Sequence, residues 1–537
     1  MRFVPCAALA ATLAAAYSPA SATTLSLDFL QSVANGTHVA APLPPTVADV
    51  VTPLARVATP DYGGTNDDPA GANRPSPRAL SNALSVPMNV QPDPIPMSNL
   101  AVAFSQLMAS HEIARSPAGG PDLNIEVAPD DPVATSIGGV PVMRQTRSLF
   151  VGGGAQGPRE QLNDVSQEFD GSTIYGSDAA TQDLLRRNDG SGKLLLDADG
   201  GLPIIGGRRK SGDVRADENL VLQKLHEVFN KDHNRIAEEI AAGCSANGLS
   251  CSGDEIFYSA KQIVTARQNT IYYDEFLPIF LGTDDLMSLV PDQSLLQGGP
   301  RVLNEFTTAA GRIGHTQVPA TITAALPGET PRSEKIEDCI FSEACLAGET
   351  LGALLFGAAT LEASPIDTVV TDGLRNGLAF GFGSPLLIDL FATNINRGRD
   401  HGLADYMEVR AALGFADAPI ETLLSQEILD LYGNEDIDLL VGLFAEAKNG
   451  GYLGETGKAL WALQMELLRP DTPDWMGHWT SGLTMARLIA DNTEVMEGDF
   501  AVSAFLAPVA PVPLPAPLAM LGVGVLGLAA MRRRARS

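Results

Sequence analysis

The chain has 537 residues, of which 45% are hydrophobic, and its formal net charge is -28 at pH 7. So many acidic groups should repel nucleic acid and anionic lipid surfaces, and we therefore expect neither as a partner. The length allows several domains, but an enzyme with a large helical core can also fold as one unit of this size.

The two ends of the chain are expected to be targeting signals that lie outside the folded domain. Residues 1–22 have the form of a secretory signal peptide, because Arg2 precedes an apolar run that ends in the small residues Ala20–Ala22. Residues 501–537 combine a linker, the sequence V-P-L-P-A at Val512–Ala516, an apolar stretch and a basic end. This pattern resembles a sorting signal of exported proteins in Gram-negative bacteria. It predicts a transient membrane anchor, a sorting protease as partner, and a periplasmic, cell-surface or secreted protein.

Five cysteines are present, and Cys6 lies in the expected signal peptide. The others form two close pairs, Cys244 with Cys251 and Cys339 with Cys345, and neither pair has the C-x-x-C spacing of a zinc site. In an exported protein these pairs favour two local disulfides, although spacing does not fix the connectivity.

Residues 23–60 are expected to form an irregular lead segment, and residues 61–500 the main domain. The first clear pattern predicts a helix over Asn99–Ala114, capped by Ser98, with apolar residues at helical spacing. His111 shares that apolar face. It is either a satisfied core histidine or an acid–base group in a dry pocket.

A short loop follows in which oxygen-bearing residues alternate. Alternation would place them on one side of an extended segment, and hydroxyls and carboxylates are the ligands that Ca²⁺ prefers. The loop is either an ordinary turn or a calcium site, to which Glu112 could add a carboxylate. The expected ligands are Ser166, Glu168, Asp170 and Ser172.

The next long helix should run to about Ala242, with Asp213 or Asp217 as its cap. Arg215 and Glu218 stand at its start. They form either a weak surface ion pair or part of a pocket in which Arg215 stabilises a developing oxyanion. A further helix is expected over Gln262–Gly282.

A helix over Leu303–His315 leads into the stretch G-R-I-G-H-T, and His315 in it is a candidate metal ligand. Such a histidine binds the metal through one ring nitrogen, and the N–H of its other ring nitrogen donates to an acceptor. Asn394, in N-I-N-R-G-R-D-H-G (Asn394–Gly402), is the candidate acceptor. Arg312 and Arg397 are candidates for binding an anionic group nearby.

Taken in order, these stretches resemble the animal-type haem peroxidase family of the peroxidase–cyclooxygenase superfamily over roughly residues 60–500. The most specific matches are Arg215–Ala237, R-I-G-H-T and N-I-N-R-G-R-D-H-G. The resemblance implies a mainly α-helical single domain with little β-structure, in which haem b is buried between central helices.

The resemblance also implies a role for each site residue. His111 would be the distal acid–base group, Arg215 its catalytic partner, and His315 the proximal iron ligand with Asn394 as its hydrogen-bond partner. Arg312 and Arg397 would bind haem propionates. Glu112 and the loop Ser166–Ser172 would hold a structural Ca²⁺.

This chain departs from the family pattern at several positions. The family usually has Gln four residues before the distal histidine, where this chain has Leu107, with Gln106 one residue earlier. Ser110 stands where an ester-forming Asp is usual, whereas Glu218 matches the second ester-forming carboxylate. Asn219 excludes a sulfonium link, and Glu112 replaces the usual Asp.

The expected function is that of a peroxidase that uses H₂O₂ to oxidise small organic or inorganic donors through a ferryl intermediate. Two alternatives stay open. A haem-dependent fatty-acid dioxygenase would need a tyrosine beside the haem, and the sequence around His315 offers none. A low-turnover surface or matrix protein would keep haem and calcium without donor oxidation.

Overall fold

In the computed structural model, the described residues up to Ala507 form one compact unit. The expected signal peptide and V-P-L-P-A sequence lie outside the described residues. No helix in the described part of the chain is long and apolar enough to span a bilayer. The structure describes residues 25–37, 51–64, 66–86, 93–342, 344–379, 386–433, 436–450, 452–471, 473 and 476–508.

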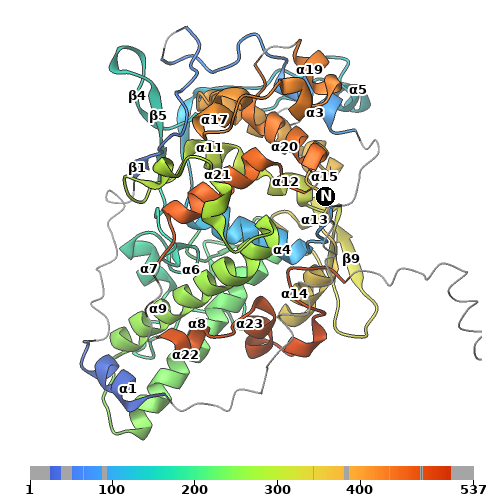
Figure 1. The fold of residues 1–537 in the computed structure, drawn as a ribbon. Helices are drawn as coiled ribbons and strands as arrows, with labels where there is room; N and C mark the ends of the chain where they lie inside the picture. The colour runs from blue at the N-terminus through green and yellow to red at the C-terminus, as the bar shows by residue number, and fades with distance from the viewer. Residues whose placement is uncertain are drawn as a thin grey trace, which may run out of the picture. The chain divides into compact units, whose positions relative to one another are not determined.

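Two long helices pack against each other in the lower part of the view in Figure 1. α8 (Leu220–Ala246) and α9 (Gly253–Thr270) lie side by side (Figure 1), and one large hydrophobic core packs around them. The cap of α8 was expected at Asp213 or Asp217, but it is Asn219, whose side chain accepts from the N–H of Leu222 at 2.9 Å. The helix starts later than expected because Asp213 bonds to Arg215 instead.

The helix expected over Asn99–Ala114 changes type partway along. α4 (Asn99–Ser105) begins at the expected cap, where Ser98 accepts from the N–H of Ala101 at 3.2 Å. The chain then continues as a π-helix over Gln106–Glu112. A π-helix is wider than an α-helix, so side chains five apart share a face.

The other two expected helices are also interrupted. The Gln262–Gly282 stretch contains the end of α9, a π-helix over Ile271–Phe276 and α10 (Leu277–Leu281), which ends at Gly282 with φ of 77°. The stretch before His315 breaks into α11 (Asn304–Thr308), a 3₁₀ turn at Ala310–Arg312 and α12 (Gly314–Gln317). The breaks let this segment follow the core surface.

The remaining helices and five small antiparallel sheets cover this core. The sheets pair β1–β5–β4, β2–β3, β6–β7, β8–β9 and β10–β11. The strands are β1 (Thr52–Pro53), β2 (Ala118–Asp122), β3 (Thr146–Ser148), β4 (Phe150–Gly152), β5 (Arg159–Asn163), β6 (Ile204–Ile205), β7 (Arg208–Arg209), β8 (Thr321–Ala324), β9 (Arg332–Lys335), β10 (Gly377–Ala379) and β11 (Leu386–Ile388). The helices are α3 (Pro77–Leu84), α5 (Pro132–Ile137), α6 (Ser172–Tyr175), α7 (Ala179–Leu185), α13 (Ile336–Cys339), α14 (Leu351–Thr360), α15 (Asp372–Arg375), α16 (Leu390–Asp400), α17 (Tyr406–Ala412), α18 (Ile420–Leu423), α19 (Gln426–Tyr432), α20 (Leu439–Gly450), α21 (Glu455–Leu467), α22 (Gly477–Thr480) and α23 (Met485–Asn492).

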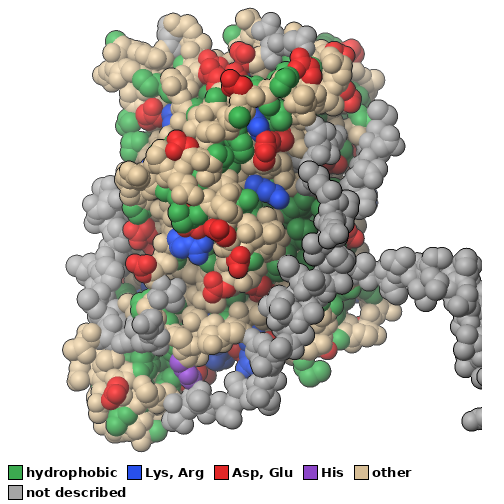
Figure 2. Space-filling model, in the orientation of Figure 1, with side chains coloured by type: hydrophobic (Ala, Val, Ile, Leu, Met, Phe, Trp, Pro, Cys, Tyr) green, Lys and Arg blue, Asp and Glu red, His purple; other side chains and the backbone are tan. Residues whose placement is uncertain are grey.

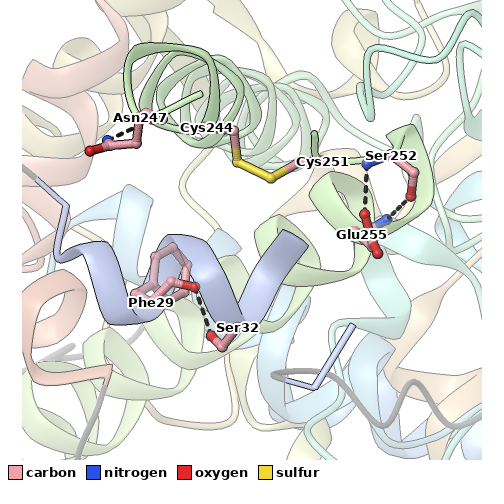
Figure 3. Close-up of a disulfide and its surroundings, with 8 residues drawn as sticks. Phe29, Ser32, Cys244, Asn247, Cys251, Ser252 and Glu255 are labelled. Atoms are coloured by element: carbon pink, nitrogen blue, oxygen red, sulfur yellow. Dashed lines mark hydrogen bonds between the residues drawn. A yellow bond between two sulfur atoms is a disulfide. The ribbon is translucent and has the colours of Figure 1, made fainter. Parts of the chain in front are cut away.

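The lead segment is not wholly irregular, because it contains α1 (Leu27–Ala34). Its apolar face packs on α8, where Leu30 and Val33 are buried. The end of α8 is joined to the start of α9 by the disulfide Cys244–Cys251 (Figure 3), and Cys339–Cys345 is the second. The two local disulfides expected from the spacing are therefore present.

The visible surface carries more acidic than basic side chains, in several separate patches (Figure 2). This agrees with the net charge of -28. The mainly α-helical fold predicted from the sequence is confirmed, with short strands at the periphery.

Candidate functional site

His111 lies near the end of the π-helix and is 3% exposed. Its Nε2 is 3.4 Å from the Gln106 amide nitrogen and 3.7 Å from a Glu218 oxygen. Its Nδ1 is buried without a hydrogen-bond partner among the described residues and lies 4.0 Å from Asp213. Burial, and then the charge of Arg215, lower the pKa of His111 well below 6.5. The ring is therefore neutral at neutral pH.

Gln106 reaches His111 because this segment is π-helical. In an α-helix the residue four before His111 would share its face, and that residue is Leu107, which is fully buried in the core. In the π-helix the residue five before takes that place. The offset of Gln106 from the family position is therefore corrected by the backbone, and an amide does stand beside His111.

Gln106 also connects His111 to the start of α8. Its amide nitrogen donates to Glu218 at 3.0 Å, and its amide oxygen accepts from Asn219 at 3.0 Å. Because one amide N–H is directed to Glu218, the other can face the lone pair of His111 Nε2. This arrangement favours the tautomer in which Nε2 is free to accept a proton. Burial raises the pKa of Glu218 from its ordinary value.

Arg215 pairs with Asp213, and not with Glu218 as the sequence suggested. Its Nε and Nη2 each donate to Asp213 at 2.8 Å, and Nη2 also donates to the carbonyls of His111 at 3.3 Å and Ala114 at 3.1 Å. Asp213 is 4% exposed. Although burial opposes it, the Arg215 guanidinium keeps the pKa of Asp213 below its usual value. Nη1, which makes none of these bonds, is the part of Arg215 left for a ligand.

His315 and Asn394 meet although they are 79 positions apart. The Asn394 amide nitrogen lies 2.6 Å from His315 Nδ1, and its oxygen accepts from Arg312 Nη1 at 2.7 Å. Burial lowers the pKa of His315 to about 4, so its ring is neutral. Burial lowers the pKa of Arg312 to about 10, and neighbouring Arg397 adds to this effect.

Arg397 projects from α16, the helix that also carries Asn394. It donates to Asp400 at 2.9 Å, to the Thr146 carbonyl at 2.9 Å and to the Ser148 hydroxyl at 3.1 Å. The Arg397 guanidinium lies close enough to Arg312 to lower the pKa of Arg312. These two neighbouring cations, with Arg312 beside His315, suit a group that carries carboxylates.

The two histidine sites lie close together. α12 packs against α4, and His315 lies close enough to His111 to be among the groups that lower the His111 pKa. Arg215 and Glu218 keep 21% and 34% of their side-chain surface accessible, and His315 is half-buried. Burial raises the pKa of Glu218 and lowers that of His315, whereas Asp213 raises the pKa of Arg215 against the effect of burial. The His315 ring is neutral, its Nε2 has no hydrogen bond within the described part of the chain, and the cation Arg312 lies beside it, so these residues fit a haem.

The oxygen-rich loop binds Glu112 directly. The Glu112 carboxylate accepts from the N–H groups of Gly171 at 2.5 Å, Ser172 at 2.8 Å and Thr173 at 2.9 Å, and from the Thr173 hydroxyl at 2.5 Å. Asp170 lies beside it and accepts from the Ser172 N–H at 3.0 Å. The loop is thus fastened to the residue next to His111.

The alternation expected for this loop ends at Gly171, whose φ of 81° turns the chain so that Ser172 begins α6. Ser166 and Asp170 are half-buried and Ser172 is buried, but the Glu168 side chain is exposed. The expectation of four side chains on one face is therefore wrong for Glu168. Gly212 touches the same loop so closely that a Cβ there would lie 2.1 Å from the Ser172 carbonyl.

The loop has hard oxygen donors that suit calcium. Burial, with the neighbouring Asp170 charge, raises the pKa of Glu112 to about 7, because two carboxylates lie together out of water. A divalent cation would relieve that repulsion. No three His, Cys, Asp or Glu side chains of the described chain converge on one point, so calcium here would also need hydroxyl and carbonyl ligands.

Asp213 and Thr173 are the residues that the sequence did not assign to the site. Asp213 was considered only as a helix cap, and Thr173 falls just beyond the alternating stretch. In the sequence, the one signal for Asp213 is the spacing D-x-R at Asp213–Arg215. This spacing lets the Asp213 carboxylate accept both from the Arg215 guanidinium and from the Arg215 backbone N–H, which lies 2.7 Å away.

Comparison with known proteins agrees with this site. The sequence profile of the animal haem peroxidase family matches residues 41–497. Dual oxidase of Drosophila melanogaster is 28% identical over 509 residues, which cover 86% of this chain and 32% of the relative. Lactoperoxidase of Mesocricetus auratus is 28% identical over 393 residues, covering 63% of this chain and 54% of the relative. This chain thus spans about a third of the dual oxidase and about half of the lactoperoxidase.

Two solved structures share the fold. Peroxidase A from Dictyostelium discoideum superposes with a TM-score of 0.69 at 23% identity, covering 86% of this chain and 95% of that chain. The fatty acid alpha-dioxygenase of Arabidopsis thaliana gives 0.67 at 18% identity, covering 91% and 90%. At these identities the likeness concerns the fold alone. The profile match over most of the sequence shows that the chain belongs to the animal haem peroxidase family.

Proposed function

We propose that this chain is a haem peroxidase that uses H₂O₂ to oxidise small donors. The observation that carries the proposal is the pair of neutral histidines, His111 and His315, whose segments pack close together. His111 stands beside Arg215 and Gln106, and His315 is backed by Asn394. A lone buried histidine would need none of these partners.

The proximal residues would hold the haem. His315 Nε2 would bind the iron, which requires its Nδ1 to carry a proton and to face an acceptor. Turning the Asn394 amide by half a turn places its oxygen there. The same turn takes that oxygen away from Arg312 Nη1, which is then left for a haem propionate, with Arg397 nearby.

When bound, the haem supplies the electrons that split the peroxide bond. On the distal side, His111 Nε2 would take the proton from the near oxygen of H₂O₂ and return it to the far oxygen, which leaves as water. Arg215 Nη1 would stabilise the negative charge that develops on the departing oxygen. Because the His111 pKa is held well below 6.5, the ring is ready to accept a proton throughout the neutral range.

The full cycle would consume one peroxide and two donors. In balanced form, H₂O₂ and two molecules of a donor A–H give two molecules of water and two A• radicals. Each donor loses one electron and one proton, and the two protons complete the two waters. Gln106 and Glu218 border the place where donors would approach His111.

The first test is an absorption spectrum of the haem-loaded protein before and after one equivalent of H₂O₂. We expect a Soret band that shifts within milliseconds and recovers when a donor is added. A Soret band that is indifferent to peroxide would support a low-turnover surface or matrix protein. Absence of any Soret band after haem loading would refute the role of His315.

A fatty-acid dioxygenase remains the competing enzyme. Its required tyrosine is absent from the α12 segment, and Arg312 stands three residues before His315. Tyr452 is the buried tyrosine whose pKa is influenced by Gln317 at the end of α12, although burial is the main cause of its raised pKa. Oxygen uptake with a polyunsaturated fatty acid, lost in Tyr452→Phe, would favour the dioxygenase.

The Glu218 carboxylate could form one covalent link to the haem. Its carboxylate lies at the distal site, whereas Ser110 cannot form the second ester found in the family. We propose a single ester through Glu218. Acid–acetone extraction should leave haem on the wild type and remove it from Glu218→Gln. Complete extraction from both proteins would exclude the ester.

Calcium is the second proposed cofactor. Its ligands would come from Asp170, Glu112, Ser166 and Ser172, with Glu168 contributing no side chain. Chelation should lower the melting temperature, and added Ca²⁺ should restore it. An unchanged melting temperature, with no calcium found by elemental analysis, would show that the hydrogen bonds of Glu112 hold the loop unaided.

We also propose that the protein is exported and processed at both ends. The two disulfides support this proposal, because such bonds persist in oxidising compartments. Mass spectrometry of the native protein should give a first residue near Thr23 and a last residue before the apolar C-terminal stretch. An intact mass of all 537 residues would contradict both cleavages.

A further inference from the structure

A short loop closed by the disulfide Cys339–Cys345 lies against the start of α8. Within it, the backbone N–H of Phe341 donates to the Glu218 carbonyl at 3.0 Å, and Ile340 pairs with Asn219 in an isolated antiparallel bridge. A cavity of about 410 Å³ borders this contact, and its lining residues include Phe341 and Asn219. The Ile340–Phe341 segment is therefore joined to α8 by backbone bonds, beside a space that side chains do not fill.

This segment is held in a conformation that is costly for its residues. Phe341 has a φ of 51°, and Leu346, directly after the disulfide, has a φ of 47°. Both values lie in the left-handed region that bulky side chains avoid. The Phe341 side chain is 62% exposed, so burial of the ring does not account for the conformation. Such strain persists where the surrounding structure fixes the backbone, and here the disulfide and the bond to Glu218 do so.

The two residues that the segment contacts are those that place Gln106 beside His111. The Asn219 side chain caps α8 through its oxygen, and its N–H donates to the Gln106 amide oxygen at 3.0 Å. The Glu218 carboxylate accepts from the nitrogen of the same amide at 3.0 Å. Two consecutive residues thus fix both ends of the Gln106 amide, and a shift of their backbone would move this amide relative to His111.

We propose that the Ile340–Phe341 segment is a positioning element of the distal site, which acts through the backbone of Glu218 and Asn219 on Gln106. It acts through other residues and is therefore not catalytic itself. The inference rests on the proposed peroxidase function, because its consequence is the rate at which the distal site reacts with peroxide. A misplacement of about 1 Å that starts far from the chemistry can lower a rate by up to about 10²-fold.

Two variants at Phe341 separate the backbone bond from the side chain, and both keep the disulfide. Phe341→Pro loses the N–H and cannot reach a φ of 51°, whereas Phe341→Gly keeps the N–H and accepts this φ without strain. At full haem occupancy, Phe341→Pro should slow the reaction with peroxide by about 3- to 30-fold. Phe341→Gly should react like the wild type. Equal rates for the two variants would overturn the proposal.

A second measurement needs no haem. Hydrogen exchange of the haem-free full chain should be faster in Phe341→Pro than in Phe341→Gly at residues 106–112 and 218–222. The reason is that the bonds that order these two stretches are loosened when the backbone bond to Glu218 is lost. Exchange that is the same in both variants would contradict the proposed path from the segment to Gln106.

The second disulfide provides a matched control for general loss of stability. Cys244–Cys251 and Cys339–Cys345 have sequence separations of 7 and 6, so each should stabilise the fold to a similar extent by restricting the unfolded chain. Replacing both cysteines of a pair by serine should slow the peroxide reaction and speed exchange at residues 106–112 only for Cys339–Cys345. Equal changes for the two pairs would show a general loss of stability, and the positioning role would be wrong.

The outcomes distinguish the positioning role from the function on which it rests. If the wild type shows no peroxide-dependent change of the Soret band, the peroxidase proposal fails, and hydrogen exchange alone decides whether the segment orders Gln106. If the band changes but Phe341→Pro matches Phe341→Gly in both rate and exchange, the peroxidase proposal stands and the positioning role is refuted.

Discussion

The distal and proximal sides of the site are built in opposite ways. On the distal side, His111 and Arg215 lie beside two carboxylates, Asp213 and Glu218, and burial together with the neighbouring charges shifts the pKa values of His111, Asp213 and Glu218. On the proximal side, one neutral amide, Asn394, serves both His315 and Arg312. This difference suits the proposed function, in which the distal side would move protons and the proximal side would hold the His315 ring in place.

Removing the distal base should have the largest effect. His111→Ala should slow the reaction with peroxide by about 10²- to 10⁴-fold while haem stays bound. In the wild type, this rate should stay constant as the pH falls through 6.5 and decline only below it, since His111 must be neutral to accept a proton. Stopped-flow absorption measures both. His478→Ala is the control, and a His111 variant as fast as this control would remove His111 from the mechanism.

Breaking the buried Arg215–Asp213 ion pair should lower the stability of the protein far more than breaking a more accessible pair would. Asp213→Asn leaves Arg215 without its charge partner and should lower the free energy of unfolding by about 3–5 kcal/mol. Asp164→Asn breaks the more accessible Arg115–Asp164 pair and should cost about 0–1 kcal/mol. Denaturant titration compares the two. Equal losses would show that Asp213 does not hold Arg215 more firmly than a surface partner could.

The proximal side should respond through binding and not through proton transfer. Asn394→Ala should weaken haem affinity by about 10- to 100-fold, because the His315 ring loses its orienting partner. Haem titration followed by the Soret band measures this. Asn247→Ala, which loses only an exposed bond within α8, is the control. If Asn394→Ala reacted more slowly with peroxide even at full haem occupancy, the proximal side would also affect proton transfer, and the proposed separation of the two roles would be wrong.

The smallest effect should come from Gln106. Gln106→Ala removes bonds to Glu218 and Asn219, each worth about 0.5–1.5 kcal/mol. Leu107→Gln, which would suit an α-helical register, should instead bury an amide in the core and cost more. Thermal unfolding ranks the two variants. If Leu107→Gln proved the milder change, the π-helical register would be wrong.

Much of the fold could be predicted because its signals are local. Ser98 does cap a helix, the cysteine pairs close over short spans, and the apolar stripe of α8 is buried as its spacing indicates. The errors arose where a competing partner decided the local structure. Asn219 took the cap of α8 since Asp213 was already bonded to Arg215, and Gly171 ended the alternation of the oxygen-rich loop.

The sequence by itself determined which residue types are present and in which order, and this was enough to point to the two histidines, the arginines and the family. Only the tertiary structure decided how they meet. The π-helix that brings Gln106 to His111, the contact of Asn394 with His315 and the position of Phe341 beside the start of α8 all depend on packing between distant segments. Residue spacing reports the local backbone, whereas such contacts depend on how the whole core closes.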